Sequence, residues 1–216
     1  TQLPVAIDQC ATSVQPVQTT EKGATVVAAA VPTETLKSLL ADFEAANVPL
    51  HLVDLSPFCY AAGIGEEISE GLIICATKQE TTVSMLQKGH LTDYRVLPAI
   101  AEPIQTGQIQ QLLREIRVLK QTAGEGDLSI VLMGDRGTPE LVETLQTNEL
   151  NVEVLSLDFG GHQVDSEFLP AVVLALRAKT ARIGQSFNFR SGRYALKGEW
   201  ANLKRKLILL ASLLSL

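Results

Sequence analysis

The chain has 216 residues, is 46% hydrophobic but only 5% aromatic, and carries a formal net charge of −6. This length allows one large domain or two small ones with a substantial core, and the excess of aliphatic over aromatic residues suits alternating helices and strands. Residues 179–206 contain eight basic residues and one acid, a net charge of +7, so the remainder carries −13. An acidic body argues against nucleic-acid binding, whereas the basic segment indicates contact with an anionic surface.

The N-terminus and the cysteines bear on the cellular compartment. The chain does not begin with Met and shows no signal peptide, so we expect a fragment of a longer protein. Cys10, Cys59 and Cys75 have no spacing typical of a metal site, and two of them lie in apolar runs. We therefore predict buried, reduced thiols and a reducing cytoplasm.

The N-terminal part predicts strands followed by an amphipathic helix. Residues 1–22 can hold one or two edge strands, and residues 24–31 predict a fully apolar strand by their length and β-branched content. A helix then opens at Thr33, because apolar residues recur at i, i+3, i+4 and i+7 and form one face. These residues are Leu36, Leu39, Leu40 and Phe43.

The predicted helix ends at Asn47, which we expect in the left-handed conformation. Residues 48–55 predict another strand, and a Ser-Pro pair beginning at Ser56 starts a short helix. This order of elements indicates the end of a lobe that begins earlier in the protein.

Residues 71–98 predict three adjacent antiparallel strands. The strands cover residues 72–76, 81–86 and 91–97, each bounded by turn residues. The elements that follow are a helix at 104–121, a strand at 128–133, a helix capped by Thr138 with Pro139 first, a strand at 152–157, a loop at 158–164 and a helix at 167–178. Because a helix separates them, strands 72–76 and 128–133 are expected to run parallel. This element order is that of a ribonuclease-H-like lobe, the half-unit of the actin and sugar-kinase fold.

In that fold the first hairpin turn binds phosphate. Its pattern is Asp, any residue and Gly, in which the Asp handles magnesium and the Gly admits backbone amides to phosphate oxygens. Here Cys75 stands in place of the Asp and Thr77 in place of the Gly, and a cysteine cannot supply the hard oxygen ligand that magnesium prefers. Lys78 and Glu80 replace small residues. The degenerate cleft is assigned to Cys75, Thr77, Gln79, Thr81, Gly134 and Asp135.

The turn after strand 128–133 is the second place where a nucleotide could sit. In actin-like folds a Gly-Gly pair there lets the backbone pass the adenosine, and the next helix presents its amides to phosphate. Asp135 replaces the second Gly and adds bulk and like charge beside any phosphate. We therefore predict an ordinary strand-to-helix turn, with no bound cofactor.

No other residues form a catalytic or metal-binding pattern. His162 with Asp165 and Glu167 lacks a second histidine at ligand spacing, and His51 and His90 are isolated. Nucleophile elbows, Cys/His pairs and phosphate-binding Lys loops are missing from the sequence. We predict a protein that is not an enzyme, with no catalytic residues and no metal site.

The C-terminal region changes in character. Residues 187–194 predict an extended linker with aromatic anchors, and Trp200 and a Lys-Arg-Lys cluster at 204–206 precede ten uncharged residues. Trp and basic residues beside an apolar run are typical of the cytoplasmic end of a transmembrane helix, which needs about 20 residues. We predict a truncated span at 207–216; a C-terminal amphipathic or core helix is the alternative. The predicted parts are the end of a first lobe at 1–66, a second lobe at 67–178, a basic juxtamembrane linker at 179–206 and the start of a transmembrane helix at 207–216.

Taken together, the chain resembles the cytoplasmic domain of the type II secretion system L protein, a bitopic inner-membrane platform subunit. It is similar, more distantly, to the actin-like pilus assembly M protein. The resemblance covers nearly the whole chain and lies in residues 26–60, 72–89, 128–145, 168–177 and 188–194.

The resemblance implies a two-lobed, actin-like α/β domain with mixed sheets and a non-catalytic role. It implies an adaptor at the cytoplasmic face of the bacterial inner membrane that holds the secretion ATPase through the N-terminal region of the ATPase. It further implies contacts with other platform subunits, attachment through a single membrane span and no nucleic-acid partner, and it leaves a homodimer open. The part of the family's first lobe that holds its first phosphate loop has no counterpart here.

Two rival classes remain. One is an actin-like ATPase or kinase lobe, including an ATP-binding pilus assembly protein, which the missing Asp-x-Gly turn disfavours. The other is a soluble α/β ligand-binding domain whose C-terminus is a core helix, which the sequence beyond Leu216 would decide.

Overall fold

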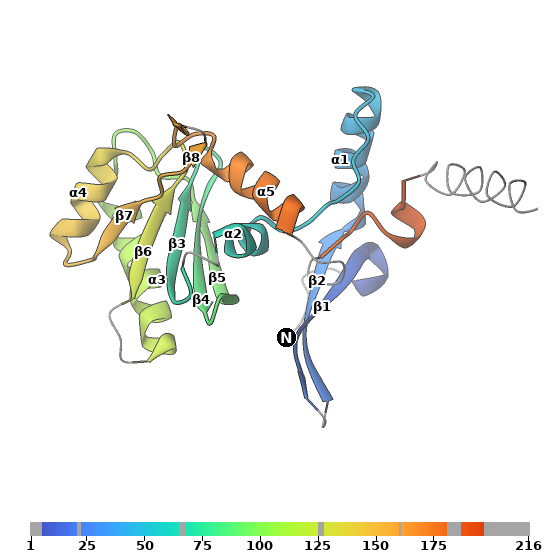
Figure 1. The fold of residues 1–216 in the computed structure, drawn as a ribbon, viewed down its shortest axis with the longest axis horizontal. Coiled ribbons are helices and arrows are strands. Elements are labelled where there is room, and N and C mark those ends of the chain that lie inside the picture. The colour runs from blue at the N-terminus through green and yellow to red at the C-terminus, as the bar shows by residue number, and fades with distance from the viewer. Residues whose placement is uncertain are drawn as a thin grey trace, which may run out of the picture. The chain divides into compact units, whose positions relative to one another are not determined.

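The computed structural model describes residues 6–20, 23–64, 68–124, 128–159, 161–180 and 187–196 (Figure 1). The described residues form two compact units. Unit 1 combines the chain up to Asp54 with residues 187–196, and unit 2 begins at Leu55 and includes the described residues up to 180. The sequence placed the lobe boundary after residue 66; the structure divides the chain earlier, because the helix that begins at Ser56 packs on the sheet of unit 2.

Unit 1 contains a two-stranded antiparallel sheet and one long helix. Strands β1 (Cys10–Thr20) and β2 (Gly23–Pro32) pair along their lengths, after a short 3-10 helix, η1 (Ile7–Gln9). Helix α1 (Thr33–Ala45) follows at once and buries Leu36 and Leu40, as the apolar spacing predicted, whereas Leu39 of the predicted apolar face is exposed. Asn47 has φ 56°, which confirms a left-handed residue just past the helix.

The predicted strand at 48–55 is wrong. These residues form no strand, and Val53 is held by isolated bonds: its N–H donates to Asn188 Oδ1 (3.4 Å) and its carbonyl accepts from Phe189 N–H (2.9 Å). Pro49 has no N–H to donate to a neighbouring strand. The two bonds of Val53 to residues 188 and 189 therefore stand where a continuous strand pairing was predicted.

Residues 187–196 belong to the core of unit 1. Phe187 and Phe189 are buried, and their rings stack with centroids 6.3 Å apart. The 3-10 helix η2 (Gly192–Tyr194) follows, and the Tyr194 hydroxyl bonds Thr33 Oγ1 at 3.3 Å. These residues were predicted as an extended linker; the structure makes them part of unit 1, where their buried aromatic side chains pack with the first part of the chain.

Unit 2 is built on a five-stranded mixed sheet with the order β5-β4-β3-β6-β7 (Figure 1). Its strands are β3 (Gly71–Ala76), β4 (Glu80–Gln87), β5 (His90–Pro98), β6 (Ser129–Met133) and β7 (Val152–Val154). The three-stranded meander and the parallel pairing of β3 with β6 are confirmed. Strand β3 is buried along its whole length, which explains its continuous apolar sequence.

The region after β6 differs from the prediction in detail. Strand β7 ends at Val154, before the predicted limit at residue 157. The predicted loop at 158–164 contains a small hairpin, β8 (Asp158–Phe159) and β9 (His162–Gln163). The Asp158 carboxylate closes its turn by accepting the Gly161 N–H at 2.7 Å, a local bond that hydrophobic periodicity does not reveal.

Helices cover both faces of the sheet. Helices α3 (Thr106–Ala123) and α4 (Pro139–Thr147) pack on one face, and α2 (Ser56–Ile64) and α5 (Leu169–Thr180) pack on the other. The cap of α4 is confirmed, because Thr138 Oγ1 accepts the Leu141 N–H at 3.3 Å and Pro139 is the first helical residue.

At the centre of the edge strand β5, the outward-facing backbone groups are hydrogen-bonded to side chains of the same strand. Asp93 Oδ1 accepts the Tyr94 N–H at 2.8 Å, and Arg95 Nη1 donates to the Tyr94 carbonyl at 2.8 Å. Both backbone groups of Tyr94 are therefore held by charged side chains of the same strand, a device that discourages strand addition.

The predicted membrane segment at 207–216 and the basic cluster at 204–206 lie outside the described residues. Among the helices that the structure describes, none combines the length and the apolar character needed to cross a bilayer.

Candidate functional site

The turn between β3 and β4 is the predicted phosphate turn, and Thr77 organises it. The Thr77 N–H donates to the Glu80 carbonyl at 2.9 Å, and so does the Thr77 hydroxyl. Thr77 Oγ1 in turn accepts the N–H groups of Gln79 (3.3 Å) and Glu80 (3.2 Å). A residue in the place of the expected glycine thus fills the turn with its own hydroxyl.

Gly134 brings the turn after β6 against the end of β3. It has φ 101°, and a Cβ at this position would collide with the Ala76 carbonyl. That carbonyl accepts the Arg136 N–H at 3.0 Å. Only glycine fits both the backbone angle and the close approach. The two predicted turns therefore meet at the same end of the sheet, where strands β3 and β6 finish.

Asp135 bridges the two turns. Its Oδ1 accepts the Lys78 N–H at 3.0 Å, and its Oδ2 lies 3.4 Å from Lys78 Nζ. A carboxylate oxygen therefore takes the amide that a phosphate oxygen would need in a phosphate-binding turn.

All four amides of the turn are consequently occupied from within the chain. The carbonyl of Glu80 holds the first, Asp135 holds that of Lys78, and Thr77 holds the remaining two. The arrangement has the form of an anion-binding turn whose anion is a side chain of the protein. Of the predicted cleft residues, the structure brings Thr77, Gln79, Gly134 and Asp135 together here.

Cys75 and Thr81 are buried and take no part in the hydrogen bonds of this turn. Cys75 lies in the apolar core formed with α2 and α5, beside Tyr60, to whose hydroxyl it is hydrogen-bonded. Burial raises the pKa of the Cys75 thiol to about 11, so the group is a neutral thiol at physiological pH. Thr81 is fully buried, and its hydroxyl has no partner among the described residues.

A second ion pair flanks the site and was missed by sequence reasoning. Arg136 Nη1 contacts the Glu102 carboxylate, and this hydrogen bond holds the pKa of Glu102 below its ordinary value of 4.5. Glu102 comes from the connection between β5 and α3, far from Arg136 in sequence. Lys78, Asp135, Arg136 and Glu102 form a cluster of alternating sign, which no local pattern in the sequence predicts.

The other predicted candidates stay apart. His51, His90 and His162 are exposed, and the described residues contain no group of three metal-ligating side chains. Cys10, Cys59 and Cys75 are buried, as predicted, and no disulfide joins them in the part of the chain that the structure describes.

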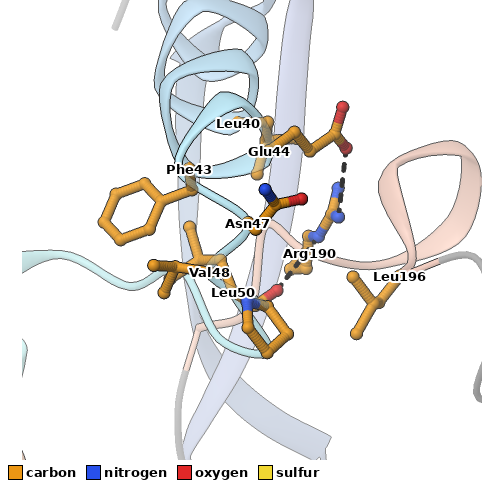
Figure 2. Close-up of a pocket in the computed structure, with 9 residues that line it drawn as sticks. Leu40, Phe43, Glu44, Asn47, Val48, Leu50, Arg190 and Leu196 are labelled. Atoms are coloured by element: carbon orange, nitrogen blue, oxygen red, sulfur yellow. Dashed lines mark hydrogen bonds and ion pairs between the residues drawn. The ribbon is translucent and has the colours of Figure 1, made fainter.

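Unit 1 contains a hollow of about 390 Å³ that the sequence did not indicate (Figure 2). It is lined by Leu40, Phe43, Glu44, Asn47, Val48, Pro49, Leu50, Arg190 and Leu196. Arg190 closes one side: Nε donates to the Leu50 carbonyl at 3.1 Å, Nη1 to the Tyr194 carbonyl at 2.7 Å, and Nη2 lies 3.6 Å from Glu44. Its guanidinium therefore ties the end of α1 to the segment that contains η2.

The fold defines the class: this is an α/β protein with an actin-like fold and a mixed sheet. The solved structure titled "PilM-PilN type IV pilus biogenesis complex" aligns with 81% of this chain and 68% of its own, at 18% identity and a TM-score of 0.58. The ethanolamine utilization protein EutJ from Carboxydothermus hydrogenoformans aligns with 65% of this chain and 60% of its own, at 14% identity and a TM-score of 0.44.

At such identities the likeness shows the fold alone. No family model matches the chain, and no curated protein matches it in sequence. The distant resemblance to the pilus assembly M protein is therefore supported at the level of the fold.

Proposed function

We propose that this chain is a non-catalytic adaptor of a type II protein secretion system. It acts at the cytoplasmic face of the bacterial inner membrane, where it recruits the cytoplasmic secretion ATPase by binding the N-terminal region of that ATPase. The observation that carries the non-catalytic part is the occupied turn, in which Asp135 and Thr77 hold three of the four amides and a carbonyl holds the fourth.

The chemistry of this site is unfavourable for magnesium nucleotides. A phosphate would have to displace the Asp135 carboxylate from the Lys78 amide and then lie beside it, where like charges repel. The position that should handle magnesium is a buried neutral thiol, Cys75. We therefore infer neither ATP hydrolysis nor specific binding of Mg-ATP at millimolar concentration.

The sequence resemblance and the fold support the part of the proposal that places the chain in a membrane assembly. The similar solved structure contains PilM in complex with PilN, for type IV pilus biogenesis. We propose that this chain, too, uses an actin-like domain to bind partner proteins. The charges of −13 and +7 support an acidic body with a basic segment at the membrane surface.

The experiment for the adaptor role is co-purification of this chain with the N-terminal region of the secretion ATPase. We expect a stable complex that buries at least roughly 1,200 Å² and that forms more slowly as salt rises, because the acidic body attracts basic residues of the partner. Failure to form a complex at any salt concentration would overturn the adaptor role. Indifference to salt would remove only its electrostatic part.

The second candidate is an actin-like ATP-binding pilus assembly protein, favoured by the same structural likeness. Calorimetric titration with Mg-ATP separates the two candidates. We expect no heat of specific binding; stoichiometric binding that substitution of Thr81 or Gly134 abolishes would establish a working nucleotide site.

A further inference from the structure

Residues 187–194, called the strap below, connect to helix α1 at both of its ends. The Tyr194 hydroxyl donates to Oγ1 of Thr33, the first residue of α1, at 3.3 Å. Arg190 Nη2 lies 3.6 Å from Oε1 of Glu44, in the last turn of the same helix (Figure 2). Thr33 and Glu44 are roughly 16 Å apart along the helix axis. The strap therefore holds α1 at two well-separated points.

The strap is also fastened to β1 and to the segment that follows α1. The Asn188 N–H donates to Ser13 Oγ in β1 at 3.3 Å. The Val53 N–H donates to Asn188 Oδ1 at 3.4 Å, and the Val53 carbonyl accepts the Phe189 N–H at 2.9 Å. The side chains of Phe187 and Phe189 are buried. Three separate parts of unit 1 are thus joined through this one segment.

Arg190 makes the largest number of polar contacts in the strap. Its side chain is only 6% exposed, and it donates to the Leu50 carbonyl at 3.1 Å and to the Tyr194 carbonyl at 2.7 Å, besides its contact with Glu44. Hydrogen bonds from a charged group are stronger than those between neutral groups. Arg193, in contrast, is exposed and lies over the Tyr194 ring, 4.9 Å from its centroid.

Unit 2 lies entirely between the two parts of unit 1 in the sequence. The bond between Val53 and Asn188 joins residues that are 135 positions apart. A pull between the N-terminal part of unit 1 and the end of the strap therefore has two routes through the molecule. One route is the set of direct bonds across unit 1, and the other is the whole of unit 2. The direct route is shorter and tightens first, so unit 2 feels the pull only after those bonds break.

We propose that the strap is a mechanical latch, with Arg190 as its principal contact. It carries tension between the N-terminal part of unit 1 and the chain that follows Leu196, so that unit 2 stays folded until the latch opens. The latch is a property of this chain alone. Its use against a pull from the membrane rests on the adaptor role proposed above.

Force spectroscopy on single molecules of the full chain tests the latch. Handles are attached at Asp8→Cys and Ala195→Cys, two exposed positions on either side of the contacts described above. We expect two separate events. The first and shorter one opens unit 1, and the second, from the unfolding of unit 2, releases roughly 400 Å of chain. Release of unit 2 before unit 1, or one event for the whole chain, would overturn the proposal.

A pair of arginine variants identifies the principal contact. Arg190→Ala should raise the rate of the first event at constant force at least roughly tenfold, because it removes hydrogen bonds from a charged group, and should leave the second event unchanged. Arg193→Ala is the matched control in the same strap and should change neither event by more than about twofold. If Arg190→Ala prevents unit 1 from folding, Tyr194→Phe takes its place, since it removes only the bond to Thr33 and should speed the first event alone.

A second pulling geometry bypasses the latch. Handles at Ser56→Cys and Ala175→Cys, both exposed and both in unit 2, load unit 2 directly. Only the long event should then occur, and Arg190→Ala should not alter it. Equal effects of Arg190→Ala and Arg193→Ala in the first geometry, or an effect of Arg190→Ala in the second, would refute the latch. These measurements contain neither the ATPase nor a membrane, so their failure would leave the test of the adaptor role untouched.

Discussion

Replacement of Asp135 by Ala is the most direct test of the occupied turn. The carboxylate makes one charge-assisted bond to the Lys78 N–H (3.0 Å) and one ion pair to Lys78 Nζ (3.4 Å). The ion pair is worth less than about 1 kcal/mol, because the Lys78 side chain is 62% exposed. A hydrogen bond to a charged group is worth about 1.5–3 kcal/mol, and water can partly replace it at this exposed turn.

We therefore expect Asp135→Ala to lower the free energy of unfolding by about 1–2 kcal/mol. Lys78→Ala is the matched control, since it removes the ion pair but keeps the backbone amide, and it should cost less than about 1 kcal/mol. Urea unfolding followed by circular dichroism measures both losses.

Hydrogen exchange at the Lys78 amide gives a local readout. We expect faster exchange in Asp135→Ala and little change in Lys78→Ala, because only the first removes the acceptor of that amide. Equal loss of stability in the two variants, or unchanged protection of this amide in Asp135→Ala, would show that the carboxylate does not occupy the turn as the structure indicates.

Three further predictions concern the same end of the sheet, around the turns that follow β3 and β6. Gly134→Ala should lower the free energy of unfolding by about 2–4 kcal/mol, since the φ of 101° is strained for alanine and the new Cβ meets a carbonyl. Gly107→Ala is the control, because a Cβ there meets open space in a helix, and it should leave the stability unchanged or raise it. Thermal unfolding compares the two variants. The stabilisation from Glu102 and Arg136 should be fully present above pH 4.5 and should be lost as pH falls through the lowered pKa of Glu102, so the difference in stability between Glu102→Gln and the unaltered chain should be present at pH 7 and should shrink steadily as pH falls below 4.5. The Cys75 thiol, with its pKa raised to about 11, should resist a thiol-specific reagent at pH 8 in the folded chain and react at once in denaturant; rapid reaction in the folded state would contradict its burial.

The sequence predicted much of unit 2, because its signals are local. Strand β3 is apolar throughout since both of its faces are covered, and Thr138 before Pro139 marks the start of a helix through its own backbone bonds. The pairing of β6 with β3 follows from the length of the intervening helix.

The failures involve bonds between distant segments. Residues 48–55 have the composition of a strand, but their partners are Asn188 and Phe189, which no periodicity identifies. In the candidate site, the departures at Cys75, Thr77 and Asp135 could be seen in the sequence. That Asp135 bonds the Lys78 amide could not, because the bond joins two turns that lie 57 positions apart in the sequence, and their close approach at Gly134 is a property of the folded sheet.

The joining of residues 187–196 to the beginning of the chain has a consequence for synthesis. Val53 and Asn188 bond across 135 positions, whereas unit 2 is continuous in sequence. A ribosome therefore completes unit 2 before it releases the phenylalanines that fill the core of unit 1. We expect unit 2 to fold first during translation, and the long-range contacts of unit 1 to close last and more slowly. During that interval strands β1 and β2, which contain no charged residue, lack the packing of Phe187 and Phe189, and we expect the nascent chain to be most exposed to chaperones then.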